Sequence, residues 1–233
     1  MSEALLPPID DQLSAAIARA TLHQPVYGGR GARDWRRGIF DEIDRDCAIL
    51  DVGKSSRDMH GELRERAGRV ETLDLNRFED YPDLLLDLCG PIPGDLHGRY
   101  DAVVCLSVLE ALHDPQAGID NLHAMLKPGG RLFLFAPFLG KYEAPPDGRY
   151  HDLFRFTRDG LAWLLRDFSA VDIYPVQGQY SAIANLLPHW KLWVEAHLGH
   201  RLNRVLDRLA EPGINALNAS GYYVRAVKWQ ASI

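Results

Sequence analysis

The sequence predicts an α/β fold in which helices cover both faces of one doubly wound, mostly parallel sheet of seven strands. Short apolar runs begin at residue 48, and stretches with helical spacing of apolar side chains separate them. The runs 48–52 and 100–106 are apolar almost throughout, which is typical of strands buried on both faces. Strands joined by single helices form parallel sheets with right-handed crossovers, so this alternation indicates the architecture.

The length and composition fit one such domain with extra helices. The chain has 233 residues, of which 46% are hydrophobic and 25% charged, so it can bury a large core. We interpret residues 47–233 as the domain and residues 1–46 as a helical segment in front of it. The formal net charge of −6 argues against a nucleic-acid partner, because surfaces that bind nucleic acids carry a basic excess.

The three cysteines indicate a cytoplasmic protein. Cys47, Cys89 and Cys105 form no CxxC pair, so we expect buried reduced thiols and neither a zinc site nor another metal site. The first residues lack a basic start followed by a long apolar segment, so we expect no signal peptide. No run approaches the roughly 18 consecutive apolar residues of a membrane span.

Seven strands are expected, at residues 48–52, 69–75, 81–89, 100–106, 131–138, 170–176 and 222–229. Helical patterns separate them, and three of these patterns are well delimited. One covers 58–67, a second follows Pro115 and ends at the turn 127–130, and a third covers 158–166 with Thr157 as its N-cap. The long loop 139–150, rich in glycine and proline, leaves the carboxyl end of a central strand, where sheets of this kind bind ligands.

Two helices are expected ahead of the first strand. Residues 8–22 place apolar side chains at helical spacing, and Trp35, Ile39 and Ile43 mark a second apolar stripe. These helices either cover a ligand site as a lid or cover an edge of the sheet. We favour the packing role, because any surface helix needs an apolar stripe.

The segment 177–221 is expected to be a helical insertion before the last strand. It carries two apolar stripes, the first formed by Leu186, Leu187, Trp190, Trp193 and Val194, the second by Leu202, Val205, Leu206 and Leu209. A cap, a homodimer face, a contact with a membrane surface and ordinary packing onto the domain all fit such stripes.

Two aspartates are expected at the carboxyl ends of adjacent strands. Asp51 and Gly53 end the run 48–52, and Asp74 ends the next strand, about twenty positions further on. In an open α/β sheet, an acidic residue in this place accepts hydrogen bonds from ribose hydroxyls. We therefore expect a nucleoside-shaped ligand across these strand ends.

The order of these motifs resembles class I S-adenosylmethionine-dependent methyltransferases, in particular the type 11-like group. The likeness covers roughly residues 47–176 and depends on motif order more than on any single motif. The stretches that carry it are Ile49-Leu-Asp-Val-Gly53, Asp74, Asp87-Leu88, Tyr100-Asp-Ala-Val-Val-Cys105, Val108-Leu-Glu-Ala-Leu-His-Asp-Pro115 and Leu126-Lys-Pro-Gly-Gly130.

By position, the resemblance implies a Rossmann-like methyltransferase fold and a site for S-adenosyl-L-methionine. The expected contacts are Asp51, Gly53 and Ser55 for the methionine part, Asp74 for both ribose hydroxyls, Asp87 and Leu88 for the adenine, and Leu106 and Ser107 beneath the sulfonium. A positively charged sulfonium and a ribose suit carboxylates at strand ends better than basic residues.

One stretch departs from the pattern of that family. The family's loop carries three glycines that alternate with other residues, whereas here it reads Gly53-Lys-Ser-Ser-Arg57. Side chains therefore stand where bare backbone usually approaches the ligand. S-adenosylmethionine has no phosphate, so the loss is more tolerable than it is for a dinucleotide. Ser55 can hydrogen-bond the methionine carboxylate, and Arg57 can pair with it.

The chemistry that the resemblance implies asks mainly for alignment of nucleophile, methyl group and sulfur in a dry site. His113 and His151 are the expected catalytic bases, since both fall in loops near the carboxyl edge. Glu110 and four further residues are expected to orient the acceptor, although surface or capping roles compete for each of them: Tyr142, Glu143, Asp152 and Arg155. The acceptor itself is expected to be a small molecule or a glycan-linked group methylated at oxygen or nitrogen.

Two other functions stay open at this point. In the first, the altered loop at 53–57 no longer binds cofactor, and the protein acts as a binding partner or scaffold through the insertion 177–221. In the second, the protein is an oxidoreductase with a nicotinamide cofactor. The second is disfavoured because the phosphate-binding glycines are missing and no Tyr-x-x-x-Lys pair is present.

Overall fold

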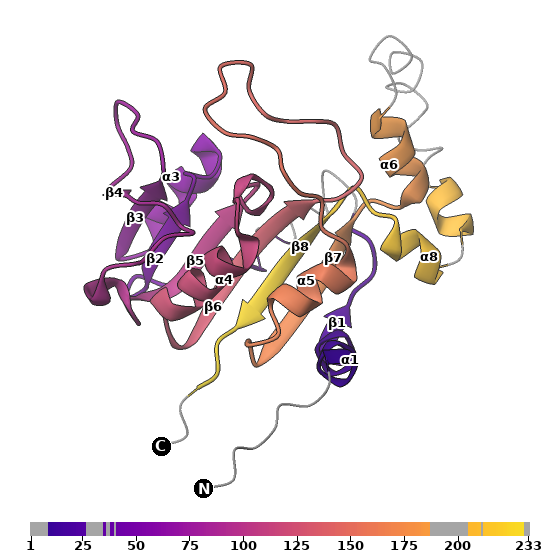
Figure 1. Cartoon of the computed structure of the whole chain (residues 1–233), viewed down its shortest axis with the longest axis horizontal. Coiled ribbons are helices and arrows are strands. Elements are labelled where there is room, and N and C mark those ends of the chain that lie inside the picture. Colours follow the sequence, from indigo (N-terminus) through magenta and orange to yellow (C-terminus); the bar gives the residue numbers. More distant parts are fainter. Residues whose placement is uncertain are drawn as a thin grey trace, which may run out of the picture.

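In the computed structural model, eight strands among the described residues form one sheet, in the order β1-β7-β8-β6-β5-β2-β3-β4 (Figure 1). Neighbouring strands run parallel except where β8 pairs with β6 and with β7. The strands are β1 Ala20–Leu22, β2 Ala48–Val52, β3 Arg69–Asp74, β4 Leu84–Leu85, β5 Tyr100–Leu106, β6 Leu126–Pro137, β7 Ala170–Val176 and β8 Gly221–Val227. The mostly parallel, doubly wound sheet is confirmed.

The structure describes residues 9–26, 35, 38–39, 41–186, 205–210 and 212–230. The helices within them are α1 Ile9–Arg19, α3 Arg57–Arg66, α4 Pro115–Met125, α5 Arg158–Leu164, α6 Gln179–Leu186 and α8 Pro212–Leu217, with the 3₁₀ turns η1 Gly94–Leu96 and η2 Leu109–Ala111. Over these ranges, every helix is too short or too polar to cross a membrane.

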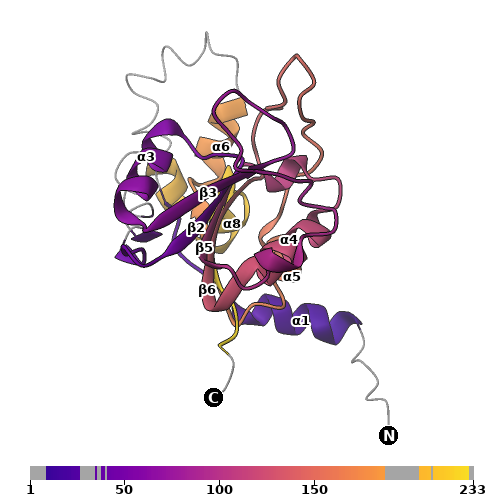
Figure 2. The same ribbon diagram turned by 90° about the vertical axis from the view of Figure 1, so that its left-hand side faces the viewer.

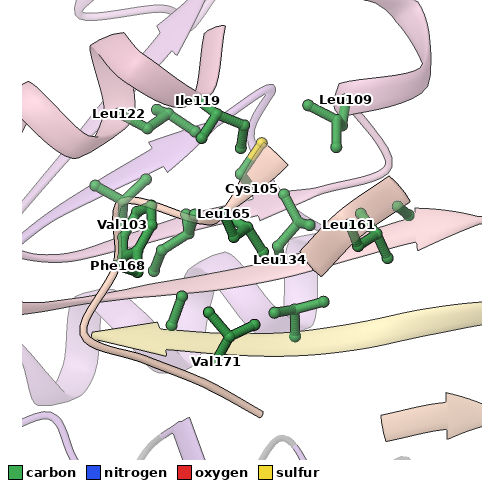
Figure 3. Close-up of a cluster of buried hydrophobic side chains, with 14 of the residues drawn as sticks. Val103, Cys105, Leu109, Ile119, Leu122, Leu134, Leu161, Leu165, Phe168 and Val171 are labelled. Carbon is green, nitrogen blue, oxygen red and sulfur yellow. The ribbon is translucent and has the colours of Figure 1, made fainter. Parts of the chain in front are cut away.

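Helices lie on both faces of the sheet, as Figure 2 shows for α3 on one side and for α4 and α5 on the other. Alternate residues of the central strands therefore enter two separate apolar clusters. Leu50 of β2 packs with side chains of α4 and α5, whereas its neighbour Ile49 packs with α3 and with Trp35. Figure 3 shows the first cluster, where Val103 and Cys105 of β5 meet Leu122 of α4. Burial on both faces explains why these strands have apolar residues at nearly every position.

Side chains at their N-termini fix where three of the helices begin. Ser56 accepts from the Met59 amide before α3, Asp114 from Ala117 before α4, and Thr157 from Gly160 before α5. Each side chain satisfies a backbone donor that has no partner inside the helix. The Thr157 cap confirms the prediction.

The seven-strand prediction is wrong by one strand. Residues 20–22, expected to continue the first helix, form β1 at the edge of the sheet beside β7. Ala20 is buried there, and Arg158 donates to its carbonyl oxygen at 3.0 Å. The apolar spacing of Ala20 fits both a helix and a buried edge strand, so periodicity alone does not separate them. The segment before residue 47 is therefore not wholly helical.

Two further element boundaries differ from the prediction. Only Leu84–Leu85 of the expected strand 81–89 pairs with β3. Strand β6 begins at Leu126, five residues before the expected start, and its pairing with β5 shifts register between Tyr100 and Ala102. The expected turn 127–130 supplies the extra residues at this shift, and Gly129 adopts a φ of 76° there.

The predicted insertion and the second predicted front helix are described in part. Trp35, Ile39 and Ile43 are buried, as expected for the packing role of that stripe. In the insertion, α6 and α8 are helical, whereas Leu187, Trp190, Trp193, Val194 and Leu202 lie outside the described residues. The homodimer through 177–221 stays a prediction.

A buried carboxylate attaches α6 to a later part of the insertion. Asp207 is 1% exposed and accepts from the Tyr180 amide at 2.8 Å and from the Ser181 hydroxyl at 2.6 Å. The α6 N-terminus is the positive end of the helix dipole, which a carboxylate stabilises. The amide of Gln179, the first residue of α6, donates to the side-chain oxygen of Asn215 in α8 at 2.8 Å.

Candidate functional site

The carboxyl ends of β5, β2, β3 and β4 lie side by side along one edge of the sheet. The register aligns the last residues of β2, β3 and β5, which makes neighbours of three predicted cofactor residues: Gly53, Asp74 and Leu106. Asp87 follows β4, the next strand along. The fold therefore gathers at one edge the strand-end residues that the sequence separates by more than fifty positions.

Asp51 is fully buried just below this edge. One of its carboxylate oxygens accepts from the Ser55 amide at 3.0 Å, and the other accepts from the Ser55 hydroxyl at 3.0 Å. The second oxygen also lies 2.7 Å from Nδ1 of His60 on α3. Both donors of Ser55 are thus engaged within the protein, so a cofactor carboxylate would have to compete with Asp51 for them.

His60 is a residue of this site that sequence reasoning missed. It lies nine positions after Asp51 in a polar helix, and nothing in its local pattern distinguishes it from a surface histidine. Only the way in which α3 lies against β2 places its ring on the buried carboxylate.

The turn after β2 needs left-handed backbone at two successive residues. Gly53 has a φ of 72°, and Lys54 has a φ of 48°. A Cβ atom at Gly53 would lie 2.7 Å from Cγ2 of Val108. The Lys54 ammonium group pairs with Asp80 at 2.8 Å and stands over the Tyr81 ring at 4.5 Å. The one glycine that the sequence retains here is thus at the position where contact is closest.

Asp74 ends β3 with a half-buried carboxylate. Its Oδ1 accepts a hydrogen bond from the Asn76 amide at 2.8 Å. Within the described residues, this carboxylate has that one hydrogen bond. The other oxygen is left to accept from a ligand hydroxyl. This geometry fits the predicted contact with ribose.

The predicted adenine residues follow β4. Asp87 is exposed, and its Oδ1 accepts from the Cys89 amide at 2.9 Å. Leu88 is buried in the core between the sheet and α4, so its side chain belongs to the packing. His113, predicted as a catalytic base, lies beside Asp87: its ring and the Asp87 carboxylate have ligand atoms within 4.8 Å of each other. This position favours a role at the adenine end of the site.

After β5, the chain turns sharply at Ser107. This residue is exposed, has a φ of 56° and donates its amide to the Phe135 carbonyl of β6 at 3.1 Å. Leu106 is half-buried at the end of the strand. The turn brings Val108 over Gly53 and leads into η2, so it joins the predicted sulfonium floor to the turn after β2.

The loop 139–156 arches above the carboxyl ends of the central strands (Figure 1). In the middle of the loop, the Arg149 carbonyl accepts from Asn76, just after β3, at 3.2 Å, and the Arg149 guanidinium stands over the Phe78 ring at 5.7 Å. A few residues later, the amides of Leu153 and Phe154 donate to the carbonyl of Glu110, after β5, at 2.9 and 3.1 Å. Because β2 lies between β3 and β5, a loop attached beyond both of them passes over the end of β2.

Asp152 and Arg155, predicted to orient an acceptor, hold this loop together. Their side chains form an ion pair, and Arg155 also donates to the Lys141 carbonyl at 2.8 Å. Asp152 in turn accepts from the Glu143 amide at 2.9 Å, and the pKa of Asp152 is lowered chiefly by its hydrogen bonds with Arg155. Tyr142 and His151, the other two predicted residues of the loop, are exposed.

Glu110 is the buried carboxyl group of this edge. It lies in η2 directly after β5, is 5% exposed, and its Oε2 has no hydrogen-bond partner within the described part of the chain. Burial is the largest cause that raises the pKa of Glu110 to about 7, and the nearby carboxylates of Glu143 and Asp152 raise it further. A backbone hydrogen bond and Arg155 oppose these effects. Such a carboxyl can take up and release a proton near neutral pH.

A comparison with known protein families matches the part of the chain that forms this edge of the sheet. Residues 50–132, which run from β2 into β6, match the family model of a methyltransferase domain. These residues therefore form a methyltransferase domain, as the resemblance to class I S-adenosylmethionine-dependent methyltransferases implied. The match agrees with the Rossmann-like fold and with S-adenosyl-L-methionine as the cofactor, both of which the resemblance implied.

Curated relatives match parts of this domain. The ubiquinone biosynthesis O-methyltransferase of Azotobacter vinelandii is 32% identical over 96 residues, which are 41% of this chain and 38% of that protein. The protein of the same name from Pseudomonas aeruginosa is 31% identical over 74 residues, 32% of this chain and 31% of its own length. The chain thus matches well under half the length of either relative.

Solved structures share the fold at low identity. The [4+2]-cyclase SpnF is 15% identical, with a TM-score of 0.54 over 95% of this chain and 93% of its own. An S-adenosylmethionine-dependent methyltransferase from Methanosarcina mazei is also 15% identical, with a TM-score of 0.50 over 82% of this chain and 97% of its own. The likeness in fold thus extends over most of the chain.

Proposed function

We propose that the protein is an enzyme that transfers a methyl group from S-adenosylmethionine to a small-molecule acceptor, at a hydroxyl oxygen in preference to nitrogen. The observation that carries the proposal is that three acidic residues lie along one edge of the sheet under one loop: Asp51 near the end of β2, Asp74 at the end of β3 and Glu110 after β5. The curated relatives are named O-methyltransferases, which supports oxygen as the acceptor atom. Glycan-linked acceptors remain within the proposal.

Asp74 and Asp51 are proposed to hold the cofactor. Asp74 keeps one carboxylate oxygen for the ribose hydroxyls, and Asp51 fixes the turn 53–56 through Ser55. Asp87, exposed after β4, is proposed to accept from the exocyclic amine of the adenine. When bound, S-adenosylmethionine supplies an electrophilic methyl group on a positively charged sulfur and leaves as S-adenosylhomocysteine.

Glu110 is proposed to take the proton of the acceptor hydroxyl. The Glu110 carboxylate would accept the hydroxyl proton as the acceptor oxygen takes the methyl group that bound S-adenosylmethionine would supply. A base with a pKa of about 7 is well matched to this step at neutral pH. We propose that Glu143, Asp152 and Arg155 orient the acceptor beside it, with His151 and Tyr142 at the exposed side of the loop.

The cellular location belongs to the proposal as well. Cys47, Cys89 and Cys105 are all free thiols in the structure. Reduced cysteines are typical of cytoplasmic proteins, so we propose that the enzyme works in the cytoplasm.

A non-catalytic role is the second candidate, and one observation favours it. Both Ser55 donors are bound to Asp51 in the turn that has lost two glycines. The [4+2]-cyclase with the same fold also shows that the fold alone does not fix the reaction. The two candidates differ in whether the carboxyl edge binds the cofactor.

Binding of S-adenosylhomocysteine separates the two candidates. We expect it to raise the melting temperature of the wild-type protein, since a ligand that binds only the native state stabilises it. Asp74→Ala should abolish this rise without unfolding the protein. The matched control is Asp95→Ala, an exposed carboxylate of η1 that precedes β5 at the opposite end of that strand. No rise in the wild type, or an equal rise in Asp74→Ala, contradicts the proposed site.

A further inference from the structure

Three side chains with metal-binding atoms converge at the adenine end of the site. One carboxylate oxygen of Asp87, Sγ of Cys89 and one ring nitrogen of His113 all lie within 4.8 Å of one another. They come from two loops, one after β4 and one between η2 and α4. The sequence predicted no metal site because it contains no CxxC pair, but the fold joins ligands that are 24 positions apart in the sequence.

The chemistry of this set selects the kind of ion. A thiolate, an imidazole and a carboxylate are the ligands that Zn²⁺ takes, whereas Mg²⁺ and Ca²⁺ prefer oxygen alone. Zinc–ligand bonds of roughly 2.0–2.3 Å place the ligands of a tetrahedral site about 3.3–3.8 Å apart. The three ligand atoms, all within 4.8 Å of one another, are close to that separation.

The two loops are already fixed against each other. Asn121 of α4 donates to the carbonyls of Leu88 and Gly90, each at 2.8 Å, and so holds the backbone on both sides of Cys89. The Cys89 thiol donates to the Asp114 carbonyl at 3.4 Å, next to His113. An ion therefore meets ligands whose backbone is in place, and little ordering is needed to bind it.

The local charge also favours a cation. Two carboxylates, Asp87 and Asp114, act electrostatically on the Cys89 side chain. Their negative charge attracts a divalent ion to this place.

We propose that Asp87, Cys89 and His113 bind Zn²⁺, with water in the fourth position, and that the bound ion excludes the adenosyl cofactor. Asp87 and His113 are exposed, so the fourth position faces solvent. The exclusion rests on the proposed function, because it assumes that Asp87 accepts from the adenine amine. The zinc site itself does not depend on that assumption.

Titration of the purified full chain with ZnCl₂ by calorimetry, after treatment with a chelator, tests the site. One ion per chain is expected, and Cys89→Ala and His113→Ala should each weaken binding at least about tenfold. The matched controls are Cys47→Ala and His97→Ala, a half-buried cysteine and an exposed histidine outside the cluster. Absence of binding in the wild type, or equal binding in the cluster and control variants, overturns the zinc site.

Competition with S-adenosylhomocysteine tests the exclusion. Saturating Zn²⁺ should weaken S-adenosylhomocysteine binding at least about tenfold in the wild type and leave it unchanged in Cys89→Ala. If S-adenosylhomocysteine fails to bind even without zinc, the proposed function and the exclusion both fail, while the zinc titration stands on its own. If zinc and S-adenosylhomocysteine bind independently, only the exclusion is overturned.

Discussion

Glu110 shows how burial gives a common side chain an uncommon property. Its carboxyl lies in η2, and its Oε2 has no hydrogen-bond partner among the residues that the structure describes. A charged carboxylate without such partners is costly inside a protein. The protein therefore favours the protonated form, and the pKa of Glu110 rises to about 7. Because burial disfavours its negative charge, the Glu110 carboxylate readily accepts a proton from a ligand.

This burial predicts a change of stability with pH. Folding raises the pKa of Glu110 from 4.5 to about 7, so between these values the native state holds more protons than the unfolded state. The free energy of unfolding therefore falls as pH rises through this window. Glu110→Gln removes the titration, so between pH 5 and 8 the wild type should lose on the order of 2–3 kcal/mol relative to the variant.

Urea unfolding of both proteins across this pH range measures the difference. Glu65→Gln, the same substitution at an exposed position on α3, is the matched control and should follow the wild-type profile. Parallel profiles for wild type and Glu110→Gln would mean that the carboxyl has no special environment.

Single residues of the site differ in how far the sequence reveals them. Asp74 was predictable because its position depends only on where a strand ends and on the spacing from Gly53. The pairing of His60 with Asp51 was not, because it depends on how α3 packs against β2. The same holds for Glu110, which was expected only to orient an acceptor: it is buried, and its carbonyl accepts from the amides of Leu153 and Phe154, more than forty residues further along the chain.

At the scale of elements, the turn after β2 joins the sheet to the site. Gly53 must adopt a positive φ and lies against Val108, so a side chain at this position is opposed by both backbone and packing. Lys54 accepts the same left-handed conformation, and its pairing with Asp80 and its contact with Tyr81 hold it there. The turn thus keeps its shape with one glycine where the family has three.

Substitution of two glycines tests this account of the turn. Gly53→Ala should lower the free energy of unfolding by about 1–3 kcal/mol, because its Cβ would lie 2.7 Å from Val108 and its φ is unfavourable. Gly61→Ala is the matched control: this glycine lies inside α3 with nothing within 4 Å of a new Cβ, so alanine should stabilise by roughly 0.5–1 kcal/mol. Chemical unfolding of both variants decides, and a neutral Gly53→Ala would contradict the strained turn.

Elements differ in predictability for a physical reason. The central strands and capped helices were predictable because burial on both faces and N-cap chemistry are local signals, as at 100–106 and Thr157. The edge strands were harder to predict: β1 was missed, and β4 is only two residues of the expected strand 81–89. β1 has three residues and β4 has two, too few to show a period, and only their neighbours β7 and β3 define them.

At the scale of the whole molecule, the sheet has two halves, and the candidate site lies at the end of one of them. The parallel strands β5, β2, β3 and β4 end in the candidate site, and the loop 139–156 spans their carboxyl ends. The other half, β8, β7 and β1, includes the antiparallel strand and joins the insertion helices α6 and α8. Long β6 links the two halves. The proposed chemistry therefore takes place at one half of the sheet only.

Amide hydrogen exchange with and without S-adenosylhomocysteine tests this division. Binding should slow exchange in the turn 53–56, in the residues that follow β3, β4 and β5, and in the loop 139–156, because a ligand across these strand ends stabilises all of them together. Exchange in α1, β1 and β7 should stay unchanged, which provides an internal control within the same chain. Protection confined to α6 and α8 would move the ligand to the insertion and contradict a site at the strand ends. Protection of the turn without the loop would show that the loop belongs to the acceptor alone, since its contacts with Asn76 and Glu110 would then form independently of the cofactor.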